Sequence, residues 1–250
     1  MIRGLYTAGA GLWANRFLAD VLTNNLANIN TPGFREARPV LASFPETLIQ
    51  VQLTGVAAPG PAPAAGLMGT GVAAVAAVPD FTAGPLRDTG VSTDLAVEGE
   101  GFFAVQTPQG VEYTRRGTFG VDANGRLVTA EGYLVLGEHG PIVVGDATFD
   151  VAPDGTITRD GNVIDRLLVA DPGDGATLQQ VDGAMFRSTA PLGPLAGARV
   201  RQGAVEGSNV DETAGLVDLL TAMRAYEASA RAVQAENDTL QKAVNDVGRV

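Results

Sequence analysis

In the C-terminal part of the chain, apolar residues recur at alternating intervals of three and four positions. This heptad spacing predicts a coiled-coil-type helix whose narrow apolar seam packs against another helix. The alternative is an ordinary amphipathic helix on its own globular core. Asn237 is the one polar residue on the seam, where a single buried Asn commonly fixes the register. The seam consists of Leu216, Leu219, Met223, Tyr226, Ala230, Val233, Asn237, Leu240, Val244 and Val247.

The N-terminal part carries a matching stripe, again with one Asn on its seam. An isolated helix with so narrow an apolar face is marginal in water. We therefore expect the two terminal helices to pack against each other or against neighbouring molecules. The N-terminal seam consists of Leu5, Ala8, Leu12, Asn15, Ala19, Leu22, Leu26 and Ile29.

Asparagine is concentrated where the N-terminal helix is predicted to end, in the stretch Asn24–Phe34. Asn is a mediocre helix former because its amide competes for nearby backbone groups. A frayed helix end running into the Pro32–Gly33 turn accounts for the last part of the stretch. Asn24, Asn25 and Asn28 precede that stop, and they point in different directions around the helix. We expect a crowd of packed helices to bury these amides and to pair them.

The middle of the chain lacks helical periodicity. Residues 36–88 carry little regular signal, and Pro59–Pro63 is predicted to be extended and stiff. From about 89 to 200, short alternating runs lie between closely spaced turn signals, which is typical of antiparallel β structure. Phe119–Leu127 and Phe149–Ile157 repeat one pattern around an Asn-Gly or Asp-Gly turn, so each is predicted to form a hairpin.

These patterns predict an α+β fold. N- and C-terminal coiled-coil-type helices pack together, and they flank an irregular or β arm and an inserted antiparallel β-rich domain. We predict an N-terminal helix of the core domain over 1–35, an arm over 36–88, a β-rich outer domain over 89–200, and a C-terminal helix that completes the core over 201–250. The candidate caps of the C-terminal helix are Ser208, Asn209 and Asp211.

Composition and charge narrow the possible partners. The formal net charge of −11 argues against nucleic acid, whose phosphate backbone requires a basic face. The chain has no cysteine, which excludes disulfides and thiolate metal sites. The uncharged run Thr47–Pro79 contains prolines and glycines, so we expect an arm and no direct membrane insertion. We expect no cleaved signal peptide, because Asn15, Arg16 and Asp20 interrupt the N-terminal apolar pattern.

The residues that could support chemistry have simpler interpretations. His139 is the only histidine, and its surroundings, Gly137–Pro141, are typical of an exposed turn. Glu98 and Glu100 would share one face of a strand, which favours a solvated face over a glycosidase carboxylate pair. Asp122–Gly125 begins like a calcium loop but lacks the later ligands, which favours a hairpin turn. We expect no active site, no cofactor and no metal site.

Several segments resemble the rod and hook proteins of the bacterial flagellum, in the order of that axial family and over nearly the whole chain. The segments are Met1–Ala8, Asn24–Phe34, Ser92–Phe103, Gln202–Val210 and Arg224–Glu227. Tyr133–Ile142 and Val163–Leu167 resemble the proximal-rod member more than the distal-rod member. Gly69–Val72 and Arg224–Glu227 are also compatible with the distal-rod member.

The resemblance implies a non-enzymatic structural subunit of the basal-body rod, which self-assembles into a helical tube and transmits torque from motor to hook for motility. It implies as partners other copies of the chain, other rod and hook subunits, the flagellar type III export apparatus, and the bushing rings around the rod. It implies a location in the basal body, within the cell envelope, after export across the inner membrane. The alternative from another class is a wall-associated hydrolase or adhesin that uses the β domain.

In the family, the terminal helices form the inner wall of the tube, and this implies where the assembly interface lies. The expected interface residues are Leu5, Leu12, Leu22, Asn24, Asn25, Leu26, Asn28, Ile29, Leu216, Leu219, Met223, Tyr226, Val233, Asn237, Leu240 and Val244.

Overall fold

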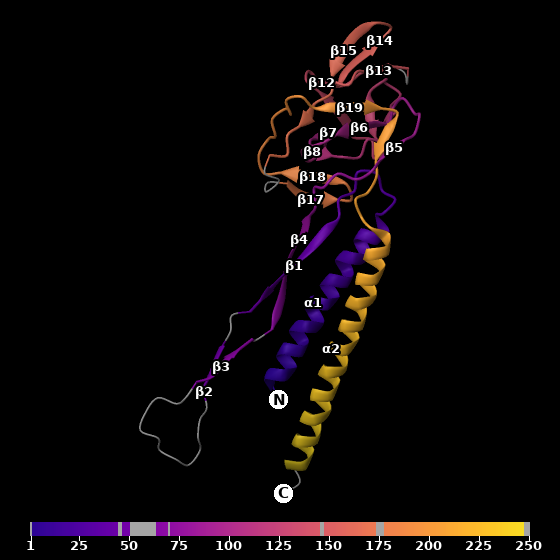
Figure 1. The fold of residues 1–250 in the computed structure, drawn as a ribbon. Helices are drawn as coiled ribbons and strands as arrows, with labels where there is room; N and C mark the ends of the chain where they lie inside the picture. Colours follow the sequence, from indigo (N-terminus) through magenta and orange to yellow (C-terminus); the bar gives the residue numbers. More distant parts are fainter. Residues whose placement is uncertain are drawn as a thin grey trace. The chain divides into compact units, whose positions relative to one another are not determined.

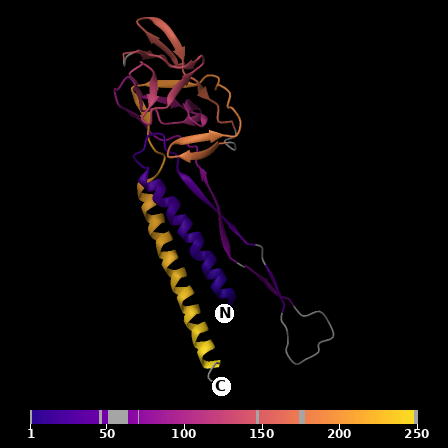
Figure 2. The same cartoon turned by 180° about the vertical axis from the view of Figure 1, so that it is seen from behind.

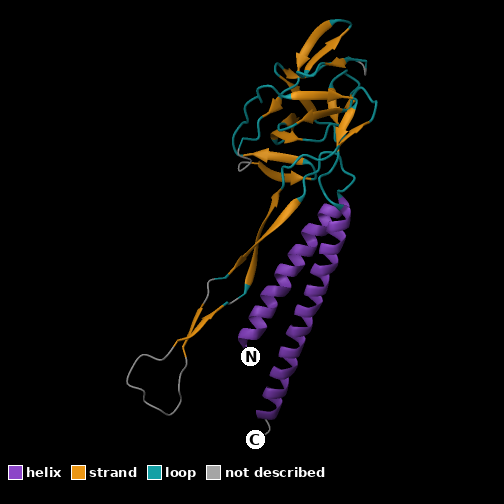
Figure 3. Ribbon diagram, viewed as in Figure 1, coloured by secondary structure: helices purple, strands orange, loops and turns teal. Residues whose placement is uncertain are grey.

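The computed structural model has one helix near each end of the chain and strands between them (Figure 1 and Figure 3). It describes residues 2–44, 47–50, 64–69, 71–145, 148–173 and 178–247. Helix α1 spans Ile2–Ala27 and helix α2 spans Glu212–Val247. The expected α+β class, with terminal helices flanking a mostly antiparallel β-rich region, is confirmed. The stiff segment predicted at Pro59–Pro63 lies outside the described residues.

The chain divides into two compact units, each drawn from distant parts of the sequence. The helical unit comprises Met1–Asn24, Ala37–Val78 and Thr213–Val250. The β unit comprises Asn25–Glu36 and Pro79–Glu212. The chain therefore crosses from one unit to the other four times.

In the helical unit, α1 and α2 run antiparallel and lie side by side in both views (Figure 1 and Figure 2). Asn15 Nδ2 donates to Ser229 Oγ at 3.3 Å. Nearer the N-terminus, Gly4 lies against the Glu236 carboxylate, because a Cβ at Gly4 would come within 2.6 Å of Oε1. The small residue at Gly4 thus lets the two helices approach each other closely.

The part of the chain after α1 forms paired strands. Strand β1 (Ala37–Ser43) pairs with β4 (Val72–Pro79), and β2 (Thr47–Gln50) pairs antiparallel with β3 (Ala64–Met68). Gly71, just before β4, has a φ of 135°. A Cβ there would come within 3.0 Å of the Ala10 side chain of α1, so a larger residue at this position would push against the helix.

The β unit contains sixteen named strands among the described residues. They are β5 (Leu86–Asp88), β6 (Leu95–Glu98), β7 (Phe102–Thr107), β8 (Gly110–Thr114), β9 (Phe119–Val121), β10 (Leu127–Thr129), β11 (Leu134–Gly137), β12 (Gly140–Pro141), β13 (Asp150–Val151), β14 (Thr156–Arg159), β15 (Asn162–Arg166), β16 (Val169–Ala170), β17 (Leu178–Asp182), β18 (Met185–Ser188), β19 (Arg199–Gln202) and β20 (Ala204–Glu206).

One large antiparallel sheet dominates this unit. Its strand order is β17-β18-β8-β7-β11-β10-β9, with β12 beside β11 and β16 beside β7. A second sheet has the order β13-β14-β15, while β19 pairs with β6 and β20 pairs with β5. The pair β20–β5 joins the segment that precedes α2 to the segment that follows β4.

Strand β7 lies between two apolar cores. Phe103 and Val105 belong to the larger core, and Phe102 and Ala104 belong to the smaller one. Successive side chains of a strand point to opposite faces, so both faces of β7 are buried. This explains why β7 is a continuous apolar run rather than an alternating pattern. In the smaller core, the rings of Phe102 and Phe186 meet edge to face with centroids 5.4 Å apart.

The repeated hairpin predicted from the sequence is confirmed in both copies. Strand β9 pairs with β10, and β13 pairs with β14, each around a short turn. Asp122 and Asp154 each accept a backbone N–H from two residues further on, which stabilises the turn locally. Gly125 and Gly155 then adopt left-handed φ values of 75° and 85°, where a Cβ would be strained.

Candidate functional site

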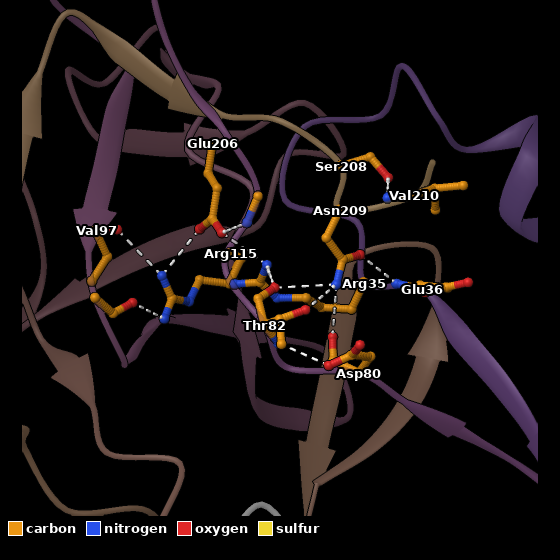
Figure 4. Close-up of polar contacts among 12 residues, drawn as sticks. Arg35, Glu36, Asp80, Thr82, Val97, Arg115, Glu206, Ser208, Asn209 and Val210 are labelled. Carbon is orange, nitrogen blue, oxygen red and sulfur yellow. Dashed lines mark hydrogen bonds and ion pairs between the residues drawn. The ribbon is translucent and has the colours of Figure 1, made fainter. Parts of the chain in front are cut away.

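Three segments that carry the chain between the two units meet inside the β unit. They are 33–36, which follows α1, 80–87, which follows β4, and 206–209, which leads to α2. The Gly33 N–H donates to the Glu206 carbonyl oxygen at 2.8 Å, and the Gly207 N–H donates to the Pro85 carbonyl oxygen at 2.8 Å. Four buried or half-buried side chains complete the meeting point (Figure 4). We call these residues, Arg35, Arg115, Glu206 and Asn209, the junction cluster.

The Glu206 carboxylate is the centre of the junction cluster, and the Glu206 side chain is 2% exposed. Its Oε1 accepts from Arg35 Nη1 at 2.8 Å and from the Gly84 N–H at 2.8 Å. Its Oε2 accepts from Arg115 Nη1 at 3.0 Å. A buried carboxylate is stable only when it is paired and hydrogen-bonded, and here one carboxylate serves two arginines.

Arg115 directly follows β8, and its side chain is buried. Besides Glu206, its guanidinium donates to the carbonyl oxygens of Val97 at 3.3 Å and Gly99 at 2.5 Å. It also lies over the Phe102 ring, 5.2 Å from the centroid, in cation–π geometry. Burial lowers the pKa of Arg115 to about 10, against the opposing effect of Glu206. The group therefore keeps its charge at neutral pH.

Arg35 and Asn209 connect the remaining backbone. Arg35 is fully buried, and its Nη1 also donates to the Thr82 carbonyl oxygen at 2.7 Å. Asn209 Oδ1 accepts the Glu36 N–H at 2.7 Å, and its Nδ2 donates to the Asp80 carbonyl oxygen at 3.0 Å (Figure 4). Asn209 thus links the segment after α1 to the segment after β4, rather than capping α2 as the sequence suggested. Charge-assisted bonds in an enclosed site have fixed geometry, so the cluster holds the three segments rigidly.

The predicted seam of α2 divides into two sets in the single chain. Leu219, Val233 and Leu240 are half-buried. The exposed seam residues are Leu216, Met223, Tyr226, Asn237 and Val244. At two places the residue of α2 that contacts α1 lies one position before the predicted seam residue. Ser229 takes the place of Ala230, and Glu236 takes the place of Asn237. Ala222 has the same spacing and is 1% exposed. The face of α2 toward α1 is therefore rotated relative to the predicted seam.

The predicted seam of α1 is more buried than that of α2. Leu22 is buried, whereas Leu5, Leu12, Leu26 and Ile29 are half-buried. Asn15, the polar residue of this seam, pairs with Ser229. Two large side chains outside the seam, Tyr6 and Trp13, are 73% and 72% exposed.

The asparagine cluster occupies the end of α1 and the turn that follows. Asn25 is only 3% exposed, whereas Asn24 is exposed. Asn28 is half-buried, and its Oδ1 accepts from Thr31 Oγ1 at 3.1 Å. The sequence predicts burial of all three amides in a crowd of packed helices. The structure buries Asn25 within a single chain, so its amide contributes to the subunit itself.

We expect Asn25→Ala to lower the free energy of unfolding of the isolated subunit by about 1–3 kcal/mol, because it leaves a buried hydrogen-bonding partner unsatisfied. Asn24→Ala is the matched control, since a change at an exposed position alters stability by about 0.5 kcal/mol or less. Urea unfolding of the two variants measures the difference. Equal midpoints would contradict the assignment.

His139 lies in the turn between β11 and β12, where its side chain is 84% exposed. The predicted exposed turn is therefore confirmed, but the sequence did not reveal its partner. Nδ1 lies 2.8 Å from Oδ1 of the buried Asp165 on β15. This hydrogen bond raises the pKa of His139 above its ordinary value of 6.5.

We expect His139→Ala to leave assembly and swimming unchanged and to affect stability only in acid. A His whose pKa is raised on folding contributes stability that is present below the unfolded pKa of about 6.5 and is lost as the pH rises through the folded pKa. Melting temperatures of wild type and variant should differ near pH 5.5 and coincide near pH 9. Loss of motility with intact folding would instead indicate imidazole chemistry.

The other candidate groups are accounted for by local structure. Glu98 and Glu100 are both exposed, but β6 ends at Glu98, so the expectation that they share one face of a strand is wrong. The Asp122 carboxylate is occupied by the Arg126 guanidinium and two backbone N–H groups, and the backbone bond from Arg126 is the main cause that lowers its pKa. In the described ranges we find no cluster of three or more metal-ligating side chains. Neither described helix is long and apolar enough to cross a membrane.

Three family models match successive parts of the chain. The model described as flagella basal body rod protein matches residues 5–35. The flagellar hook protein FlgE/F/G D1 domain matches residues 96–164, and the flagellar basal body rod FlgEFG protein C-terminal model matches residues 201–246. Arg35, Arg115 and Glu206 fall in three different matched segments, so the junction cluster joins all three.

Curated relatives match over nearly their whole length. The flagellar basal-body rod protein FlgG of Agrobacterium fabrum is 34% identical, over 93% of this chain and 94% of the relative. FlgG of Borreliella burgdorferi is 32% identical over 98% of both chains. The flagellar basal-body rod protein FlgF of Caulobacter vibrioides is 32% identical over 92% of both chains.

Proposed function

The chain belongs to the flagellar basal-body rod protein family and is a structural subunit of the rod, and from this we propose that its copies assemble into a helical tube that carries torque from motor to hook. The partners are other rod and hook subunits, and the location is the flagellar basal body. The rod-protein relatives, whose matches span nearly the full chain, carry this conclusion.

We propose that the terminal helices form the assembly interface, including the seam residues named above. The observation that supports this is the large apolar side chains that a single copy leaves exposed on both helices. The seam residues Met223 and Val244 are 52% and 69% exposed, and Trp13, on α1 outside the predicted seam, is 72% exposed. Burial of such a side chain contributes about 1.5–3 kcal/mol, so contact with a neighbouring molecule would stabilise the assembly. The resulting helices share load in the manner of a coiled coil.

The junction cluster supports the transmission of torque. The chain crosses between its two units four times, and the cluster ties together the segments next to three of these crossings. A load carried into the β unit along one segment is therefore shared with the other two. We propose this shared loading as the role of the cluster.

We also propose that the flagellar type III export apparatus carries the subunit across the inner membrane and that the bushing rings of the envelope surround the assembled rod. The resemblance of Tyr133–Ile142 to the proximal-rod member supports a place in the proximal rod. Relatives named FlgG and FlgF match at similar identity, so the position within the rod stays a prediction.

Electron microscopy of concentrated full-length protein tests the main proposal, and the expected result is tubes of uniform diameter. A muramidase assay and a wall-pelleting assay test the hydrolase or adhesin alternative. Wall cleavage or wall binding without tubes would overturn the proposal.

In dilute solution we expect protease to cleave within the helical unit and to leave the β unit, Asn25–Glu36 and Pro79–Glu212, because one copy leaves much of the α2 seam exposed. Limited proteolysis with mass spectrometry maps the surviving fragment. Resistance of the whole dilute chain would show that the helices are stable without neighbours.

A further inference from the structure

Two exposed faces of the helical unit differ in character and match in size. On α1, Tyr6 and Trp13 are seven residues apart and therefore point to the same side of the helix. On α2, Leu216, Leu220 and Met223 form an aliphatic face and are 43%, 56% and 52% exposed. We call these the aromatic face and the aliphatic face. Each extends over seven residues, or about 10.5 Å of helix.

The two faces also carry complementary charge. Arg16 lies one turn beyond Trp13 and is exposed, with Asp20 3.9 Å away as its only ion-pair partner among the described residues. Glu212 lies one turn before Leu216 and is exposed. When Trp13 is set opposite Leu216 on an antiparallel helix, Arg16 comes next to Glu212 and Tyr6 comes next to Met223. A parallel alignment loses the contact between Arg16 and Glu212.

We propose that the aromatic face of one copy docks antiparallel on the aliphatic face of the next copy; this rests on the proposed assembly and names its contact. The antiparallel direction follows from the single chain, where α1 and α2 already run antiparallel. Copies that point the same way along a shaft preserve this relation between α1 of one and α2 of another. Because the two faces differ, the contact is heterologous, and it repeats without closing into a dimer. Trp and Tyr are enriched among the residues that dominate binding at interfaces, and the flexible Met side chain packs well against aromatic rings.

Disulfide cross-linking between separate copies tests the contact, since the native chain has no cysteine and gives no background. One protein carries Arg16→Cys and the other carries Glu212→Cys, so that both anchors stay intact. The two are mixed, assembled and oxidised. The expected result is a covalent dimer that contains one copy of each. Asp218→Cys replaces Glu212→Cys in the matched control, because Asp218 is exposed but points away from the aliphatic face, and the dimer is then lost.

Other outcomes separate this contact from the assembly itself. Tubes that form without a disulfide between the Arg16→Cys and Glu212→Cys proteins overturn the contact and leave the rod function standing. A disulfide between the Arg16→Cys and Glu227→Cys proteins within such tubes would likewise overturn the contact and leave the rod function standing. Absence of tubes from the cysteine-free protein overturns the proposed function and the contact together. As a second measure, Trp13→Ala should lose tube formation, and wild-type tube formation by this variant would overturn the contact.

Discussion

Replacing Glu206 by Gln is expected to lower the free energy of unfolding of the β unit by about 3–5 kcal/mol, because it leaves two buried arginines without a counter-charge. Arg35 and Arg115 both donate to this carboxylate, and their side chains are 1% and 3% exposed. Glutamine keeps the shape but supplies only one acceptor oxygen and no charge. Domains are stable by only about 5–15 kcal/mol, so the variant should unfold well below the wild-type urea midpoint.

The matched control is Glu131→Gln. Glu131 also pairs with an arginine, Arg116, but these side chains are 42% and 30% exposed. An exposed ion pair contributes about 0–1 kcal/mol, so this variant should unfold close to wild type. If both variants lowered the free energy of unfolding equally, burial would not be the reason that the junction cluster stabilises the β unit. Exchange of Arg35, Arg115 and Glu206 together for apolar residues of similar volume should be less harmful than Glu206→Gln alone, because no buried charge is then left unpaired.

Leu219→Asp is expected to abolish tube formation and swimming while the β unit stays folded. Leu219 is half-buried in a single copy and lies on the predicted seam of α2. A carboxylate there forfeits apolar burial and must be desolvated, which costs several kcal/mol, roughly, at every repeat of the assembly. Swimming of cells that carry only the variant, electron microscopy of the purified protein, and thermal unfolding of its β unit measure the three parts of the prediction.

Ala228→Asp adds the same charge on the exposed side of α2 and should assemble normally. If Ala228→Asp fails as completely as Leu219→Asp, net charge rather than the seam controls assembly. If Leu219→Asp swims normally, the seam is not the interface.

Local patterns in the sequence were sufficient to predict the helices and several turns. The heptad spacing predicted both helices, since helical periodicity records which side is apolar. The Asn124-Gly125 and Asp154-Gly155 pairs predicted their hairpins because the turn geometry itself requires a left-handed glycine.

The junction cluster was not predictable in this way. Its ion pairs join residues far apart in the chain, so no spacing rule brings them together. Glu206 directly follows the apolar residues Ala204 and Val205, but Arg35 stands between Phe34 and Glu36, so its neighbours in the sequence do not single it out. Charged residues are almost never fully buried unless they are paired, but the charged surroundings of Arg35 give no sign in the sequence that it is buried.

The rotation of α2 has a different reason. The predicted seam and the face toward α1 share Leu219, Val233 and Leu240, and spacing alone does not separate the two stripes. The larger side chains, such as Met223, made one stripe conspicuous in the sequence. Against α1 the structure instead places small residues such as Ser229, which permit close approach of the helices.

The helical unit takes α1 from the start of the chain and α2 from its end, with the β unit between them. During synthesis, every segment of the β unit emerges before α2 does, so that unit is complete while α1 still waits for its partner. A chain cut short after Glu212 keeps a folded β unit but offers no second helix to its neighbours. Such a copy keeps the aromatic face on α1 but lacks the aliphatic face on α2, so under the proposed contact it could dock on a neighbour and could not accept a following copy.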